Sequence, residues 1–341
     1  QHPEYSIFRQ HPLDYLESLE KCITTALAEL TEEQKDHVIG IGVDTTGSTP
    51  VPVDKNGIPL ALLDEFAENE NAMFFLWKDH AAAAEADEIN KLFRNNSEND
   101  YTKYQGDYSA EWYWAKILYA VRHDEAIRQA AYTWEEHCDW MTGILCGETR
   151  PEKIYHSACA AGHKALWHSE WNGLPAASVL EQLDPYLVQV RERYGNAPQP
   201  STVKVGTLCP EWAKKLGLKE STVISGSSFD AHAGAVGAGI QKKTFVCTMG
   251  TSCVDMFVEK PENLKGKDIQ AYCGQAENSI LPGYVGVETG QAAFGDIFAW
   301  FKRLLEWPLT ELAVDENSGI SDELYKKVED RILVMLQKKA E

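Results

Sequence analysis

A β-branched run, a Gly/Ser turn and a helix of small residues follow one another over 221–239, in the sequence STVISGSSFDAHAGAVGAG. This order places Asp230 directly after a predicted strand and at the start of a predicted helix. Ligands of open α/β sheets bind at the carboxyl ends of strands, and small residues let a partner approach the backbone closely. The segment therefore predicts an α/β fold with a functional carboxylate at Asp230. On this spacing alone, a helix-capping aspartate among close-packed small residues is the alternative.

Strands and helices alternate elsewhere along the chain. Residues 37–44, HVIGIGVD, form a short run rich in valine and isoleucine, which is typical of a buried strand. Apolar residues recur at helical spacing over 13–30, and helical patterns dominate from about 77 to 145. The last of these patterns is WEEHCDWMTGILCG, over 134–147. A further helical pattern over 179–195 is interrupted at Pro185. The alternation predicts sheets covered by helices.

Length and charge narrow the class of protein. A chain of 341 residues is long enough for two domains. The net charge of −20 repels phosphate backbones, which argues against nucleic acid or an anionic membrane as a partner. No apolar run reaches the length of about 18 residues that a membrane span needs, and the first residues resemble no signal peptide. The eight cysteines include no C-x-x-C pair, so the sequence predicts reduced thiols in a cytoplasmic protein and no metal site.

A second segment, TMGTSCVD, could bind phosphate. Gly250 is flanked by hydroxyl residues and is followed by Thr251 and Ser252, between two β-branched runs. A tight turn of this kind can direct amides and hydroxyls at phosphate oxygens, although a plain hairpin turn is the better interpretation of the segment alone. The composition changes near Thr222, from tryptophan-rich helices to Gly/Ser-rich strands. We therefore expect domains over 1–222 and 223–341.

Taken together, segments spread from about Phe8 to Pro308 resemble the FGGY carbohydrate-kinase family, and within it the kinases of L-ribulose. The resemblance implies two actin-like (ribonuclease H-like) ATPase domains with a cleft between them that holds sugar and ATP, the second domain being incomplete here. The segments keep the same order as in the family: GVDTTGSTPVPVD, FAENENAMFFLWKDH, YSAEWYWAKIL, CDWMTGILCGETRP, AGHKALWH, VGTLCPEWAKKLGL, GSSFDAHAGAVGAG, MGTSCVDM and VETGQAAFGDIFAWF.

The resemblance also implies roles for single residues. Asp230 matches the carboxylate that accepts the proton of the attacking sugar hydroxyl, a role that suits a positioned carboxylate in phosphoryl transfer. The residues expected to bind the sugar are Gly47, Trp77, Lys164 and Glu288. The residues expected to bind the phosphates of ATP are Gly250, Thr251 and Ser252, with Mg²⁺ bridging those phosphates. Taken singly, Trp77 would be assigned to core packing and Lys164 to a solvated surface.

Asp44 offers a competing assignment. The segment VIGIGVDTTGST reads as a strand followed by D-x-x-G-[ST], which resembles the first phosphate loop of actin-like kinases. In that case Asp44 would be a metal-binding carboxylate. The collinear match places it instead on a later strand beside the sugar pocket, and the flanking segments fit only that register.

The resemblance leaves the family's first hairpin and its adenosine-binding Gly-rich segment without a counterpart. We therefore expect a fragment of low activity that associates through exposed edges, as a homodimer or a larger species. The activity implied for the natural protein is ATP-dependent phosphorylation of L-ribulose to L-ribulose 5-phosphate. Two alternatives stay open. One is a kinase of another pentulose or pentitol, such as xylulose or ribitol, and the other is a sugar-binding relic without catalysis.

Overall fold

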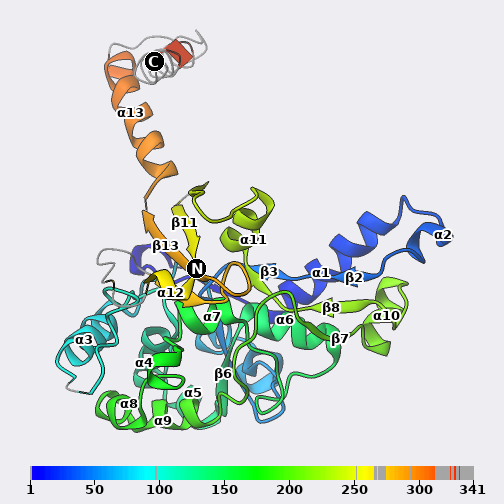
Figure 1. The fold of residues 1–341 in the computed structure, drawn as a ribbon, viewed down its shortest axis with the longest axis horizontal. Helices are drawn as coiled ribbons and strands as arrows, with labels where there is room; N and C mark the ends of the chain where they lie inside the picture. The colour runs from blue at the N-terminus through cyan, green and yellow to red at the C-terminus, as the bar shows by residue number, and fades with distance from the viewer. Residues whose placement is uncertain are drawn as a thin grey trace. The chain divides into compact units, whose positions relative to one another are not determined.

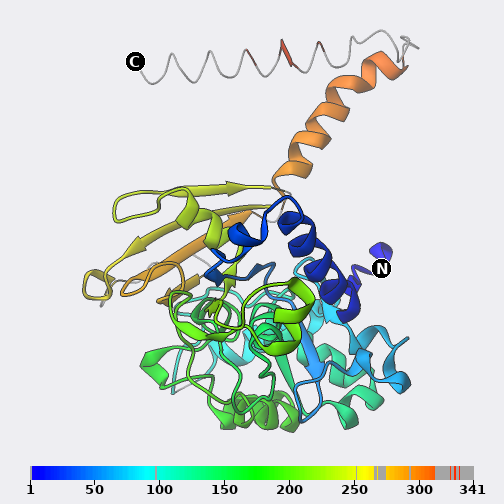
Figure 2. The same ribbon diagram turned by 90° about the vertical axis from the view of Figure 1, so that its right-hand side faces the viewer.

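The computed structural model describes residues 2–96, 98–250, 252–264, 267, 274–291, 293–311, 323, 326, 327 and 330. These fall into two compact units, one formed by 1–246 with 256–289 and the other by 247–255 with 290–341. Figures 1 and 2 show the elements from two directions. No helix in the described part of the chain is long and apolar enough to cross a bilayer.

The strands of the first unit are short and form several small sheets. Two parallel pairings, β2 with β8 and β3 with β9, bring residues 40–45 beside residues 223–229. Strand β7 pairs antiparallel with β8, β4 with β6, and β1 with β5. Their bounds are β1 (Arg9–Gln10), β2 (Gly40–Ile41), β3 (Asp44–Thr45), β4 (Pro50–Val53), β5 (Phe74–Phe75), β6 (Thr133–Glu136), β7 (Lys204–Thr207), β8 (Val223–Ser225) and β9 (Ser228–Phe229).

Most of the helices also belong to this unit. Those of the α type are α1 (Pro12–Leu27), α2 (Glu32–Lys35), α3 (Ala83–Arg94), α4 (Tyr113–His123), α5 (Glu125–Ala130), α6 (His137–Cys146), α7 (Ala158–His163), α8 (Ala177–Leu183), α9 (Pro185–Glu192), α10 (Pro210–Leu216), α11 (Asp230–Gly237) and α12 (Pro261–Leu264). Short 3₁₀ turns lie at η1 (Pro3–Tyr5), η2 (Leu60–Leu62), η3 (Asp64–Phe66), η4 (Glu70–Ala72) and η5 (Ser169–Trp171).

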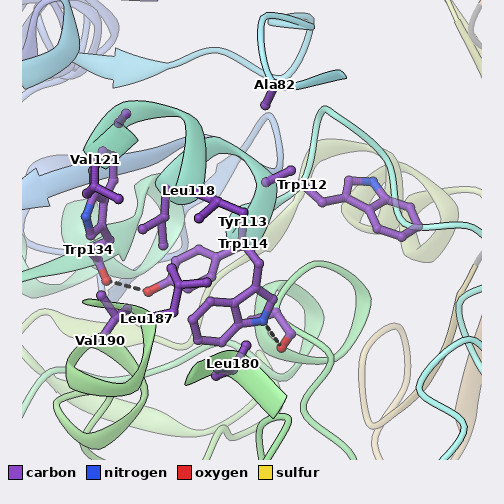
Figure 3. Packing of buried hydrophobic residues seen from close by; sticks show 14 of the residues in the cluster. Ala82, Trp112, Tyr113, Trp114, Leu118, Val121, Trp134, Leu180, Leu187 and Val190 are labelled. Carbon is purple, nitrogen blue, oxygen red and sulfur yellow. Dashed lines mark hydrogen bonds between the residues drawn. The ribbon is translucent and has the colours of Figure 1, made fainter. Parts of the chain in front are cut away.

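The main core lies between β6 and the helices α3, α4, α8 and α9, which are grouped together in Figure 1. Its largest members are aromatic, several of them are drawn in Figure 3, and two of these donate hydrogen bonds to backbone carbonyls inside the protein. The Tyr113 hydroxyl donates to the Trp134 carbonyl at 2.8 Å, and the Trp114 indole donates to the Ala165 carbonyl at 2.8 Å. The tryptophan-rich segment seen in the sequence therefore forms much of the main hydrophobic core.

Local sequence signals predict several boundaries correctly. The helix expected over 13–30 is α1, and the break expected at Pro185 separates α8 from α9. The helical pattern expected over 134–147 is wrong at its start, because 133–136 form strand β6. Here tertiary pairing decides: Thr133 to Glu136 lie opposite β4, with all four side chains buried.

Strands β12 (Gly274–Glu277) and β13 (Val285–Gln291) pair antiparallel, with Glu277 opposite Val285. Strands β10 (Val246–Met249) and β11 (Cys253–Glu259) enclose the turn predicted around Gly250. Helix α13 (Gly295–Glu311) belongs to the second unit and is continuous in Figure 2. The compact units divide near Val246 rather than near Thr222, and the expected domains over 1–222 and 223–341 stay a prediction.

Candidate functional site

Asp230 lies where two parallel strands end. Strands β3 and β9 pair with Asp44 opposite Ser228, and α11 begins at Asp230 directly after β9. The Asp230 carboxylate is exposed, and its Oδ1 accepts from the Ala231 amide at 2.7 Å. Partial burial raises its pKa above the ordinary value, and the neighbouring Asp44 carboxylate raises it further. A raised pKa makes Asp230 a better proton acceptor than a free carboxylate.

The ring of Phe229, just before Asp230, lies at the centre of the site. A Cβ atom added at Gly47 would lie 2.0 Å from this ring, so only glycine fits there. The Lys164 ammonium lies 5.8 Å from the centre of the same ring and 5.1 Å from that of Trp112. Segments far apart in sequence thus meet at the ring of Phe229, the residue before Asp230.

Glu288 is the centre of a buried charged group, which we call the Glu288 cluster (His163, Lys164, His232 and Glu288). Lys164 Nζ donates to Glu288 Oε1 at 2.8 Å, and His232 Nε2 lies 2.8 Å from Oε2. His163 Nδ1 lies 3.5 Å from Oε1. On its other side the His232 ring reaches Cys159, with Nδ1 and Sγ 2.7 Å apart. Lys164 is 8% exposed and Glu288 5%, so this charge is held inside the protein.

The Glu288 cluster stays charged because opposite charges touch. Burial alone would raise the pKa of Glu288, but His163, Lys164 and His232 together hold that pKa well below its ordinary value. Burial also opposes charge on His232, yet Cys159 and Glu288 raise its pKa to about 10. His163 has no such support, and burial lowers its pKa to about 3. At neutral pH the cluster therefore holds a carboxylate, an ammonium and an imidazolium, with His163 neutral.

Lys116 ties two of the predicted sugar-binding segments together. Its fully buried Nζ donates to the carbonyl of Ser48 at 2.6 Å and to that of Leu76 at 2.9 Å. Ser48 follows Gly47, and Leu76 precedes Trp77, which lies half-buried in a turn after β5. The backbones at Gly47 and Trp77 are thus held near each other, which is compatible with both lining one pocket. The predicted contacts of these residues with sugar stay predictions.

The predicted phosphate turn lies in the second unit. Gly250 N donates to the carbonyl of Ser252 at 2.8 Å, and Gly295 N donates to the carbonyl of Gly250 at 3.2 Å. The turn joins β10 to β11, as the sequence predicted. Thr251 lies outside the described residues, so its expected role stays a prediction.

Ligands for a metal also occur in this site. Single ligand atoms of His163, His232 and Glu288 lie within 4.8 Å of one another. The Lys164 ammonium already contacts Glu288 there, and its charge would repel a cation. Within the described residues, no group of three acidic side chains brings its oxygens this close. The oxygen cage that Mg²⁺ prefers is therefore not preformed among them.

Residue patterns alone did not point to three members of this site. His232 lies two residues after Asp230, and His163 directly precedes Lys164, so both histidines stand inside segments that the resemblance highlighted. Their position beside Asp230 and Lys164 was the feature of the sequence that could have identified them as site residues. Cys159 gave no such signal, because nothing in its sequence surroundings points to His232, 73 residues away.

Comparison with known proteins gives consistent results. The profile of the FGGY family of carbohydrate kinases, C-terminal domain, matches residues 245–336. The chain is 44% identical over 340 residues to a ribulokinase of Vibrio parahaemolyticus, covering 99% of this chain and 60% of that protein. It is 36% identical over 304 residues to a ribulokinase of Shouchella clausii, covering 88% and 52%. The chain thus spans about half to three fifths of the length of these relatives.

Solved structures share the fold at low identity. The xylulose kinase of Rhodospirillum rubrum matches with a TM-score of 0.68 at 16% identity, covering 94% of this chain and 58% of that one. The glycerol kinase of Plasmodium falciparum with ADP matches with a TM-score of 0.66 at 16% identity, covering 94% and 59%. These likenesses confirm the predicted actin-like (ribonuclease H-like) α/β fold class. Together with the relatives and the profile, they show that this chain belongs to the FGGY family of carbohydrate kinases.

Proposed function

We propose that the protein catalyses phosphoryl transfer from ATP to L-ribulose, giving L-ribulose 5-phosphate. The observation that carries the proposal is the position of Asp230, an exposed carboxylate of raised pKa beside the Glu288 cluster. Identity to proteins named ribulokinase favours L-ribulose as the sugar over xylulose or ribitol. The predicted cytoplasmic location and homodimer stay predictions.

Each residue of the site has a role that suits a polyhydroxyl substrate. Lys164 donates and Glu288 accepts, so together they can bind neighbouring hydroxyl groups in a fixed orientation. Trp77 would offer a ring face to the apolar side of the sugar. The missing side chain at Gly47 lets its backbone pack directly against the Phe229 ring. Asp230 then accepts the proton of the hydroxyl as that oxygen attacks phosphorus.

ATP supplies the γ-phosphoryl group in this proposal. Gly250, Thr251 and Ser252 would bind its phosphates through backbone amides and hydroxyls. Mg²⁺ would be held chiefly by the phosphate oxygens, since the described part of the chain preforms no carboxylate cage for it. The contribution of the chain is then to position the sugar and to remove one proton.

The replacement Asp230→Asn tests the proposal in the protein. Asparagine keeps the shape but cannot accept the proton, so we expect kcat to fall about 100-fold or more while the sugar KM changes little. Turnover would be measured by ATP-dependent phosphorylation of L-ribulose, with xylulose and ribitol as competing substrates. Glu211→Gln, on the surface helix α10, is the matched control and should leave both constants unchanged.

Three results would contradict the proposal. Near-normal turnover of Asp230→Asn would remove this residue from the mechanism. A higher kcat/KM for xylulose or ribitol than for L-ribulose would favour the alternative kinases. Sugar binding by calorimetry without any phosphorylation by the unsubstituted protein would favour a sugar-binding relic.

A further inference from the structure

The hairpin formed by β10 and β11 carries a second group of potential metal ligands. Sγ of Cys247 lies 3.2 Å from Sγ of Cys253, and Sγ of Cys253 lies 3.7 Å from Oδ1 of Asp255. One ligand atom from each of the three residues falls within 4.8 Å of the others. All three belong to the second compact unit and none to the Glu288 cluster.

The hairpin explains why these side chains meet. Cys253 and Asp255 are two residues apart on β11, so strand geometry directs both to the same face. Cys247 comes from β10, across the turn in which Gly250 N donates to the Ser252 carbonyl at 2.8 Å. Two strands and one tight turn thus bring a C-x5-C-x-D pattern together, although it contains no C-x-x-C pair.

We propose that Cys247, Cys253 and Asp255 form a binding site for a thiophilic divalent cation, with Zn²⁺ as the preferred ion. In tetrahedral zinc sites with Zn–S bonds of about 2.3 Å, ligand atoms lie about 3.7 Å apart. The separations of 3.2 Å and 3.7 Å are close to this value, so small side-chain shifts admit the ion. Two thiolates and a carboxylate suit Zn²⁺ better than Mg²⁺ or Ca²⁺, which take oxygen ligands.

The exposure of the three residues indicates that the site would be open to solvent on one side. Cys253 is buried and held within β11, Asp255 is half-buried, and Cys247 is exposed. The cation would therefore have two ligands fixed by the sheet and one on the solvent side, with a fourth position left to water. Bound there, it would link β10 to β11 on both sides of the turn that joins them.

Metal titration of the reduced, chelator-treated protein tests the site without any measure of kinase activity. Zn²⁺ would be titrated in competition with a chromophoric chelator, and Co²⁺ would serve as a spectroscopic probe. We expect one equivalent of Zn²⁺ with a Kd of about 1 μM or tighter. The Co²⁺ form should show thiolate-to-metal charge-transfer absorption. Asp255→Asn replaces an anionic ligand by a neutral amide, so it should weaken Zn²⁺ binding about 10-fold or more.

Variants of the cysteines complete the experiment. Cys247→Ser changes an exposed side chain and should abolish the charge-transfer band while leaving the fold unchanged by circular dichroism. Cys22→Ser, at an exposed thiol of α1, is the matched control and should bind Zn²⁺ like the unsubstituted protein. Binding that survives Cys247→Ser, or is lost in Cys22→Ser, would overturn the site. So would a Cys247–Cys253 disulfide found by mass spectrometry in protein kept under reducing conditions.

Discussion

In the first unit, two buried groups of ionisable side chains shift the pKa of their glutamate in opposite directions. In the Glu288 cluster a carboxylate touches an ammonium and an imidazolium, and its pKa falls well below the ordinary value. In the second group, which we call the Ser48 cluster (Ser48, Thr49, Lys116 and Glu136), Lys116 faces carbonyl oxygens and Glu136 accepts from the Ser48 hydroxyl and the Thr49 amide. There burial dominates, raising the pKa of Glu136 to about 7 and lowering that of Lys116 to about 7.

The difference shows what a buried side chain needs in order to stay charged. Hydrogen bonds from neutral groups keep a buried ionisable side chain satisfied, but they do not repay the loss of hydration of a full charge. Direct contact with opposite charges does so in the Glu288 cluster. That cluster can present charge to a polar ligand, whereas the Ser48 cluster acts as a support beneath Gly47 and Trp77. Substitutions of similar shape in the two clusters test this distinction.

The largest effect is expected for Glu288→Gln. Glutamine keeps the shape but leaves Lys164 and His232 buried without their counter-charge. We expect the free energy of unfolding at pH 7 to fall by about 3–5 kcal/mol. Urea denaturation would measure it, with Glu277→Gln on β12 as control, since the Glu277 carboxylate accepts from the exposed Ser169 hydroxyl and lies outside the Glu288 cluster. A loss below about 1 kcal/mol would mean that Glu288 is not the centre of a charged group.

A smaller effect is expected for Lys116→Met. Methionine fills a similar volume but leaves the carbonyls of Ser48 and Leu76 buried without their donor. We expect a loss of about 2–3 kcal/mol in unfolding free energy, and a raised sugar KM with kcat nearly unchanged, because the substitution loosens binding segments and touches no reacting atom.

Lys103→Met is the matched control for Lys116→Met, because Lys103 forms an exposed pair with Glu170. We expect this control to change the unfolding free energy by less than about 1 kcal/mol. If Lys116→Met lowered the unfolding free energy no more than the control does, the Ser48 cluster would not support the segments of Gly47 and Trp77.

Positions in the fold that depend on local signals could be predicted from the sequence. The Gly/Ser turn and the run of small residues identified Asp230 at the end of a strand, and Pro185 marked a helix boundary. Recognition of the family then added Lys164 and Glu288 as members of one site, and the structure brings them into contact at 2.8 Å. Their role in binding sugar stays a prediction.

Partners that are set by tertiary contacts could not be predicted. Lys164 and Glu288 are 124 residues apart, and the Ser48 and Glu136 side chains 88 apart, so no periodicity links them. Strand β6 shows the same limit, since pairing with β4 overrides a local helical pattern. The sequence also gave no reason to expect that two buried glutamates would have pKa values shifted in opposite directions, because the shift depends on which charges the fold places beside them.

The smallest effect is expected for Glu136→Gln, the same change as in the Glu288 cluster. Because burial raises the pKa of Glu136 from 4.5 to about 7, this carboxyl is partly protonated at neutral pH, and glutamine resembles its protonated form. At pH 4.5, where the folded Glu136 carboxyl is protonated, we therefore expect the free energy of unfolding to change by no more than about 1 kcal/mol, because one neutral group replaces another of the same shape.

The pH dependence of this variant separates the two clusters most sharply. The folded-state pKa of Glu136, about 7, lies above the ordinary 4.5, so the folded protein binds the proton more tightly. The stability that this group contributes is therefore fully present below its unfolded pKa and is lost as the pH rises through the folded value. Glu136→Gln lacks this loss, so the difference in unfolding free energy should move in favour of the variant by up to about 1.4 kcal/mol per pH unit between pH 4.5 and 7. Urea denaturation at several pH values in this range measures it. A difference that does not vary with pH would mean that Glu136 titrates normally, and the contrast with Glu288 would then disappear.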